Sequence, residues 1–277
     1  MKKIAFALGG GGHMGANEVG MLRALIEHGV RPDLVVGTSV GALNGAAIAA
    51  DPSAETVARL RSLWTTLDEA SIFGGSWLNG ATNLVRRRTH LHSNATLRAL
   101  IETMVPATRF DELAVPFQCV AACIERASEH WFSEGPLADA ILASAAVPGV
   151  LPPVEIGGEH FVDGGVVNSI PISRAVELGA TEIYVLHVGR IERPLEPPRN
   201  LVQVAAVTFE IARRHRFARD LASLPDGVVA HVLPSGEPEP PRATDLSQYN
   251  YRDRKAVVRR ISRAYRATQQ YLEGGAS

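Results

Sequence analysis

The sequence predicts an α/β protein whose first strands are parallel. Short apolar runs alternate with longer segments in which apolar residues recur at helical spacing. Two of these runs, at 4–8 and 34–36, each lead through a glycine-containing turn into a helical segment. With 277 residues, of which 46% are hydrophobic and 21% charged, the chain is long and apolar enough to bury one large core. These observations favour a single α/β domain over residues 1–277.

The first fifty residues are expected to form a βαβα unit. The strand at 4–8 is followed by glycines and then by a helix with Val19, Leu22 and Ile26 on one face. The strand at 34–36 is followed by the small helix-forming residues of 42–50. Because the two strands are expected to be parallel, both turns lie at their carboxyl ends, the edge at which open α/β sheets bind ligands.

The rest of the chain alternates in a similar way until about residue 190. A segment rich in proline and charge at 190–200 reads as a linker, and it separates a motif-bearing part (4–190) from a helical region (200–277). Asn94 is placed as the cap of its helix. Strands are expected at 116–124 and 183–188, and helices at 52–67, 94–104, 137–146, 174–179, 201–219 and 251–272.

Composition and charge exclude several classes of protein. The formal net charge of −1 gives no whole-molecule attraction to nucleic acid or to an anionic membrane. The apolar run at 4–8 is too short for a signal peptide, and no run approaches the ~20 apolar residues of a membrane span. The two cysteines, Cys119 and Cys123, are expected to be buried free thiols, as suits a reducing compartment. A cytoplasmic location is therefore expected.

The sequence Gly37-Thr38-Ser39-Val40-Gly41 has the pattern of a nucleophile elbow. A strand precedes it and a helix follows it, the context in which a sharp turn lifts a serine hydroxyl clear of a sheet. Glycines on both sides of Ser39 remove side chains that would collide there. A helix N-terminus carries about half a positive charge, which favours an oxyanion nearby. The alternative is a turn that merely joins a strand to a helix.

Three interpretations compete for Gly10-Gly11-Gly12-His13-Met14-Gly15. As a dinucleotide fingerprint it lacks the acidic residue that should close the second strand, and as a phosphate-binding loop it lacks the Gly-Lys-Ser/Thr sequence. As an oxyanion hole it would present backbone N–H groups of Gly10, Gly11, Gly12 and His13 beside Ser39. This third interpretation explains both glycine loops together, and it is the preferred one.

The base that activates the serine has two candidate positions. Asp163-Gly164 between apolar flanks is a strong hairpin-turn signal, yet Asp163 can also serve as a general base, with Gly164 and Gly165 allowing close packing on the elbow. His187 follows Asp163 and would complete a Ser–Asp–His order. Against that triad, only the strand at 4–8 precedes the strand that leads into the elbow, which is fewer strands than α/β-hydrolases have there.

These motifs together resemble the patatin-like phospholipase family over about residues 4–190. The glycine loop is similar to that family's oxyanion loop, 37–41 to its elbow, and 163–165 to its third motif. The resemblance implies a three-layer α/β/α fold with a largely parallel sheet. It also implies a Ser39–Asp163 dyad that hydrolyses acyl or phospholipid esters without a metal. Met14 departs from the family, which usually has Arg or Lys there.

Two further function classes stay open at this stage. An acyltransferase or thioesterase acting on carrier- or CoA-bound acyl groups would use a related elbow, and the Met14 change would suit a catalytically silent scaffold. Residues 70–92 contain aromatic residues and a basic cluster, Arg86 to Arg88. They are interpreted either as a lid that makes transient contact with a lipid surface or as a solvated loop.

Overall fold

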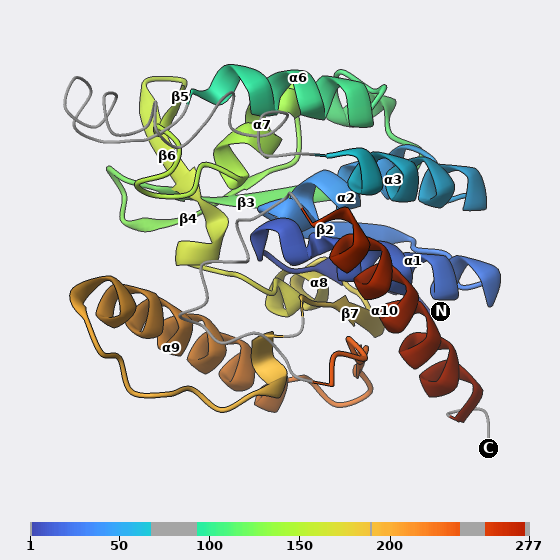
Figure 1. Ribbon diagram of the computed structural model, residues 1–277. Helices are drawn as coiled ribbons and strands as arrows, with labels where there is room; N and C mark the ends of the chain where they lie inside the picture. Colours follow the sequence, from blue (N-terminus) through green and yellow to red (C-terminus); the bar gives the residue numbers. More distant parts are fainter. Residues whose placement is uncertain (1, 68–92, 189, 239–252, 275–277) are drawn as a thin grey trace.

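An eight-stranded sheet forms the middle layer of the protein in the computed structural model, which describes residues 2–67, 93–188, 190–238 and 253–274 (Figure 1). Along the sheet the order is β5-β6-β3-β2-β1-β7-β8, and β4 also pairs with β3. The strands are β1 (Ile4–Leu8), β2 (Leu34–Thr38), β3 (Phe117–Cys123), β4 (Ser128–Phe132), β5 (Val154–Ile156), β6 (Glu159–Asp163), β7 (Glu182–Leu186) and β8 (Val229–Val232).

Helices cover both faces of this sheet. The α-helices are α1 (Ala16–Glu27), α2 (Val40–Ala50), α3 (Ala54–Thr66), α6 (Asn94–Met104), α7 (Leu137–Ser144), α8 (Ile172–Glu177), α9 (Leu201–Ala222) and α10 (Arg254–Gly274). Short 3-10 turns are η1 (Gly12–Gly15), η2 (Phe110–Glu112), η3 (Gly164–Val166) and η4 (Arg190–Glu192). Figure 1 shows α9 on the opposite side of the sheet from α3 and α6. The three-layer α/β/α fold is therefore confirmed.

The strand β1 is apolar throughout because both of its faces are covered. Successive side chains of a strand point to opposite faces. Phe6 and Leu8 pack into the larger core with α1 and α2, whereas Ala5 and Ala7 pack into the smaller core beneath α8 and α9. A strand buried on both faces reads as a continuous apolar run, which is how this segment appears in the sequence.

The predicted parallel pairing of the first two strands is confirmed. Ala5 pairs with Leu34 and Leu8 with Gly37, so the two strands end side by side. The glycine loop after β1 and the turn after β2 consequently lie at the same edge of the sheet.

A less expected feature is that β2 and β6 share one edge of β3 and meet there end to end. Val120 of β3 pairs with Thr38 of β2, and the next residue, Ala121, pairs with Asp163 of β6. The other edge at both positions is occupied by the continuous strand β4. Since β2 runs parallel to β3 and β6 antiparallel to it, the carboxyl ends of the two strands point at each other.

Several boundaries and one element differ from the prediction. The helix at 94–104 is present, but its capping side chain is Ser93, which accepts from the Ala95 N–H, and not Asn94. The region 200–277 is not purely helical, because β8 joins β7 in parallel. Cys119 and Cys123 are buried free thiols, as predicted. The lid or loop predicted at 70–92 lies outside the described residues.

No helix in the described ranges is long and apolar enough to cross a membrane.

The C-terminal helix α10 packs closely against α1 at Gly20. A Cβ atom added there would lie 2.8 Å from the Tyr265 backbone nitrogen and would also collide with the Ile261 carbonyl oxygen. Backbone atoms cannot rotate away as the tip of a side chain can. The absence of a side chain at Gly20 therefore sets how near the two helices come.

This packing makes the sign of one substitution predictable. Gly20→Ala should lower the free energy of unfolding by about 1–3 kcal/mol, the usual cost of overpacking. Helix propensity alone would act in the opposite direction by ~1 kcal/mol. Urea unfolding of the two proteins measures the difference, with Gly274→Ala as control because open space surrounds that position. A Gly20→Ala protein at least as stable as the parent would refute the packing argument.

Candidate active site

Ser39 lies in a sharp turn between β2, which ends at Thr38, and α2, which begins at Val40. Its backbone has φ 56° and ψ −121°, a conformation that side-chain-bearing residues rarely adopt. A Cβ on Gly37 would lie 2.5 Å from the Gly41 carbonyl oxygen, and a Cβ on Gly41 would collide with the Leu8 carbonyl. The strained serine and the two close approaches are the geometry expected of a nucleophile elbow.

The hydroxyl of Ser39 donates a hydrogen bond to Asp163. The Oγ–Oδ2 distance is 2.5 Å, and both residues are only 6% exposed. The other carboxylate oxygen, Oδ1, accepts from the Gly165 N–H at 2.7 Å. These contacts fix the carboxylate with one oxygen directed at the serine, so the two predicted residues are in hydrogen-bond contact.

The hairpin alternative for Asp163-Gly164 is wrong. Asp163 ends β6, and the chain continues into the 3-10 turn η3. A Cβ on Gly164 would collide with the Val120 carbonyl oxygen of β3, so a glycine is needed where the chain leaves the sheet. The end of β2 occupies the next position along that edge of β3, which explains why β6 cannot continue.

Burial dominates the electrostatics of this carboxyl. It raises the pKa of Asp163 above the ordinary aspartate value because a charge is poorly solvated there. Three smaller effects oppose it: the hydrogen bonds from Ser39 and Gly165, and the positive charge of Arg213. A carboxylate whose basicity is raised in this way is better suited to accept a proton from a hydroxyl.

The glycine loop after β1 lies against the serine. A Cβ on Gly10 would lie 3.2 Å from the Ser39 Cβ, and one on Gly11 would collide with Val188. Gly12 has φ 61°, in the left-handed region. The Gly10 N–H, however, donates to the Ser169 carbonyl at 2.9 Å. Gly10 therefore cannot supply an N–H donor to an oxyanion, contrary to the prediction that grouped it with Gly11, Gly12 and His13.

The next two residues of the loop are buried. His13 is 3% exposed, and its Nε2 is in hydrogen-bond contact with the Arg260 guanidinium of α10. Met14 is 1% exposed, as expected for a residue that packs. Gly15 lies directly against the elbow, because a Cβ there would collide with Val40.

His187 is buried at the end of β7 but has other contacts. Its Nε2 lies 3.7 Å from Glu192 Oε1, and burial lowers its pKa, against the opposing effects of Glu192 and of a hydrogen bond that the ring donates to the Leu233 backbone. The hydroxyl of Ser39 donates to Asp163 instead.

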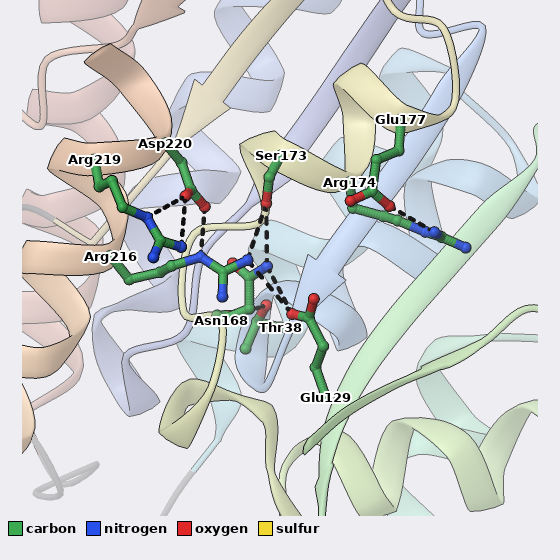
Figure 2. A network of polar contacts seen from close by, with 9 residues as sticks. All are labelled: Thr38, Glu129, Asn168, Ser173, Arg174, Glu177, Arg216, Arg219 and Asp220. Carbon is green, nitrogen blue, oxygen red and sulfur yellow. Dashed lines mark hydrogen bonds and ion pairs between the residues drawn. The ribbon is translucent and has the colours of Figure 1, made fainter. Parts of the chain in front are cut away.

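Sequence reasoning missed the residues that support the site from behind. The Ser39 N–H donates to Ser144 Oγ at 2.9 Å. Thr38 Oγ1 donates to the Asn168 carbonyl at 2.8 Å, and both of these residues are drawn in Figure 2. Arg213 of α9 donates to Ser169 Oγ at 2.6 Å. Thr38 belongs to the elbow motif, but Ser144, Asn168, Ser169 and Arg213 belong to no short motif, since each is distant in sequence from the residue that it contacts.

Two cavities, both partly open to solvent, meet at Ser39. The larger, of about 650 Å³, is apolar, and its lining includes Leu43, Leu97, Ile101 and Ile141. The smaller, of about 410 Å³, is more polar and includes the glycine loop, Asp163, Ser169 and Arg213. The described part of the chain contains no group of three or more His, Cys, Asp or Glu side chains that could hold a metal ion.

The comparison with known proteins agrees with the fold and identifies a family. A model of the patatin-like phospholipase family matches residues 6–176. A solved structure, VipD from Legionella pneumophila, aligns with this chain at a TM-score of 0.52 and 13% sequence identity. The alignment covers 99% of this chain and 67% of the VipD chain, and at this identity it shows a likeness of fold alone.

Curated relatives share part of their length with this chain. A patatin-like phospholipase domain-containing protein of Caenorhabditis elegans is 33% identical over 198 residues, covering 68% of this chain. Lysophospholipase NTE1 of Mycosarcoma maydis is 29% identical over 199 residues, also covering 68% of this chain. The aligned region spans only 14% and 10% of those two relatives. The family model and these relatives show that the chain belongs to the patatin-like phospholipase family.

Proposed function

We propose that the protein is a serine acyl hydrolase that cleaves lipid or phospholipid esters with Ser39 as nucleophile and Asp163 as general base. The observation that carries the proposal is the 2.5 Å hydrogen bond from Ser39 Oγ to a buried carboxylate, made at a strained elbow. A serine hydroxyl is a weak nucleophile at neutral pH and needs such an adjacent base.

The proposed reaction has two halves. Asp163 takes the Ser39 proton as Oγ attacks the acyl carbonyl carbon, and the backbone N–H groups of Gly11, Gly12 and His13 stabilise the oxyanion. The leaving alcohol takes the proton from Asp163 as the carbon–oxygen bond breaks, which leaves an acyl-serine. Asp163 then removes a proton from water as the water oxygen attacks the acyl carbon. The proton passes from Asp163 to Ser39 Oγ as the bond from Oγ to the acyl carbon breaks, which releases the acid and restores both residues.

The two cavities at Ser39 support a lipid ester as substrate. The apolar cavity matches an acyl chain, because burying its methylene groups is favourable by about 0.8 kcal/mol each. The more polar cavity, with Asp163 and Arg213 in its lining, is the expected side for the leaving group. The lysophospholipase named among the relatives acts on substrates of this general class.

The first prediction concerns the nucleophile. Ser39→Ala should leave the fold intact and lower ester turnover by several orders of magnitude, because the covalent route is lost. Fluorophosphonate labelling and p-nitrophenyl ester hydrolysis measure this, with the exposed Ser62→Ala as control. A folded Ser39→Ala protein that keeps a tenth of the parent activity would exclude Ser39. Acid released into water indicates a hydrolase, whereas an acyl group recovered on an added thiol or alcohol indicates a transferase.

The second prediction concerns the base. Asp163→Asn should lower kcat by about 10²- to 10⁴-fold, the usual contribution of a positioned general base. His187→Gln should change kcat far less, because the Ser39 hydroxyl donates to Asp163. Steady-state kinetics of both variants on one ester measure the difference. The opposite ranking would replace the dyad with a Ser–His–Asp triad.

The third prediction follows from the raised pKa of Asp163. Because the folded-state pKa lies above the unfolded one, stability is greatest with this carboxyl protonated and is lost as pH rises through the folded-state pKa. At pH 7 Asp163→Asn should therefore increase the free energy of unfolding even though it lowers kcat. The increase should vanish below about pH 3.9, where the parent carboxyl is protonated in both states.

Urea unfolding at pH 7 and at low pH tests this prediction, with Asp226→Asn at an exposed position as control. An Asp163→Asn protein that is less stable than the parent at pH 7 would show that the site favours the charged carboxylate.

A further inference from the structure

The side chain of Arg213 connects α9 to the glycine loop. Arg213 donates from Nη2 to the Gly10 carbonyl at 2.8 Å and from Nε to Ser169 Oγ at 2.6 Å. Its Nη1 donates to Glu210 Oε2 at 2.8 Å, and the side chain is only 8% exposed. This contact comes from a helix outside residues 6–176, the part of the chain that the family model matches.

The contact with Gly10 bears on the direction of the next N–H group. The Gly10 carbonyl and the Gly11 N–H belong to one planar trans peptide unit, so they point in opposite directions. A donor that bonds the Gly10 carbonyl therefore fixes the direction in which the Gly11 N–H points. Donation to the carbonyl also polarises the peptide and strengthens the N–H as a donor.

The other hydrogen-bonding group of Gly10 is held as well. Its N–H donates to the Ser169 carbonyl, and the hydroxyl of the same Ser169 accepts from Arg213. The adjacent residue, Asn168, accepts from Thr38, next to the nucleophile. The segment 168–169 thus connects the elbow, the glycine loop and α9.

The helix that carries Arg213 is itself held in place. Arg216, one turn further along α9, bonds Asp220 at 2.7 Å and Ser173 at 3.3 Å, and it lies 3.7 Å from Glu129 of β4 (Figure 2). Glu210 is 2% exposed and pairs with both Arg213 and Arg214, which compensates its charge. The position of the Arg213 guanidinium is consequently set by several elements and not by one flexible side chain.

We propose that Arg213 is a positioning residue of the active site, which acts through Gly10 to orient the Gly11 N–H toward the oxyanion. The proposal rests on the proposed function, because it assumes that Ser39 attacks a carbonyl beside this loop. Met14, the loop residue at which the family usually carries a positive charge, is uncharged and buried. Arg213, a basic side chain that bonds this loop, comes instead from the C-terminal part of the chain.

A second consequence concerns the base. Burial raises the pKa of Asp163, and the positive charge of Arg213 is one of the effects that lower it again. Loss of that charge should therefore raise the pKa further and move the acidic limb of the kcat/KM profile to higher pH. A purely structural role of Arg213 would not predict a shift in this direction.

The test compares Arg213→Gln, Arg213→Lys and Arg214→Gln in the full chain, with p-nitrophenyl esters as substrate. Arg214 is the matched control, since it pairs with the same Glu210 from the same helix but bonds the Arg193 carbonyl and not the glycine loop. Urea unfolding establishes that each variant is folded. Kinetics across pH then give kcat, KM and the acidic limb.

Arg213→Gln should lower kcat by about 10- to 100-fold, less than the ~10²- to 10³-fold that removal of a whole donor costs. KM should change little, because the oxyanion exists only in the transition state. The acidic limb should move to higher pH. Arg213→Lys should keep the parent's acidic limb with an intermediate kcat, and Arg214→Gln should resemble the parent in both.

The proposal would be overturned if folded Arg213→Gln and Arg214→Gln had equal kcat values and the same acidic limb in their kcat/KM profiles. If Arg213→Gln does not fold, a folded Arg213→Lys with the parent's kcat would overturn it, and one with a lowered kcat would support it. Failure of the proposed function is recognised separately, because Ser39→Ala would then retain activity.

Discussion

The candidate site depends on one constraint of the sheet: two strands compete for the same edge of β3. The carboxyl ends of β2 and β6 arrive at Val120 and Ala121 from opposite directions, and neither chain can continue in the plane. Each must leave the sheet at that point, β2 through the elbow and β6 through η3. Ser39 and Asp163 are the residues at these two exits. Their 2.5 Å hydrogen bond is therefore a result of strand register.

The crowding at this junction has an energetic cost that the surrounding structure offsets. Ser39 holds a backbone conformation that costs of order 1–3 kcal/mol, and Asp163 is a carboxyl in a poorly solvated place. A hydrophobic core on each face of the sheet holds the strands that carry both residues in position. Such local conflict within a consistent fold is common at functional sites, because catalysis needs groups that are held away from their preferred states.

The C-terminal part of the chain is integrated with the site and is not an appendage. The strand β8 extends the sheet, α10 packs on α1 at Gly20 and its Arg260 contacts His13 of the glycine loop. On the opposite face, α9 reaches the same loop through Arg213. The loop between β1 and α1 is thus supported from both sides of the sheet by residues far away in the sequence.

The sequence by itself determined the local features of this protein. Apolar spacing and glycine positions identified the strands β1 and β2, their helices and the elbow around Ser39, because these depend on neighbouring residues. The family resemblance implied that Asp163 acts with Ser39, but only the tertiary structure decided how the two meet, that the Gly10 N–H is used within the fold and that Arg213 supports the loop. Each of these pairs is separated by more than a hundred residues, and strand register and helix docking bring them together. No periodicity in a sequence records such distant contacts.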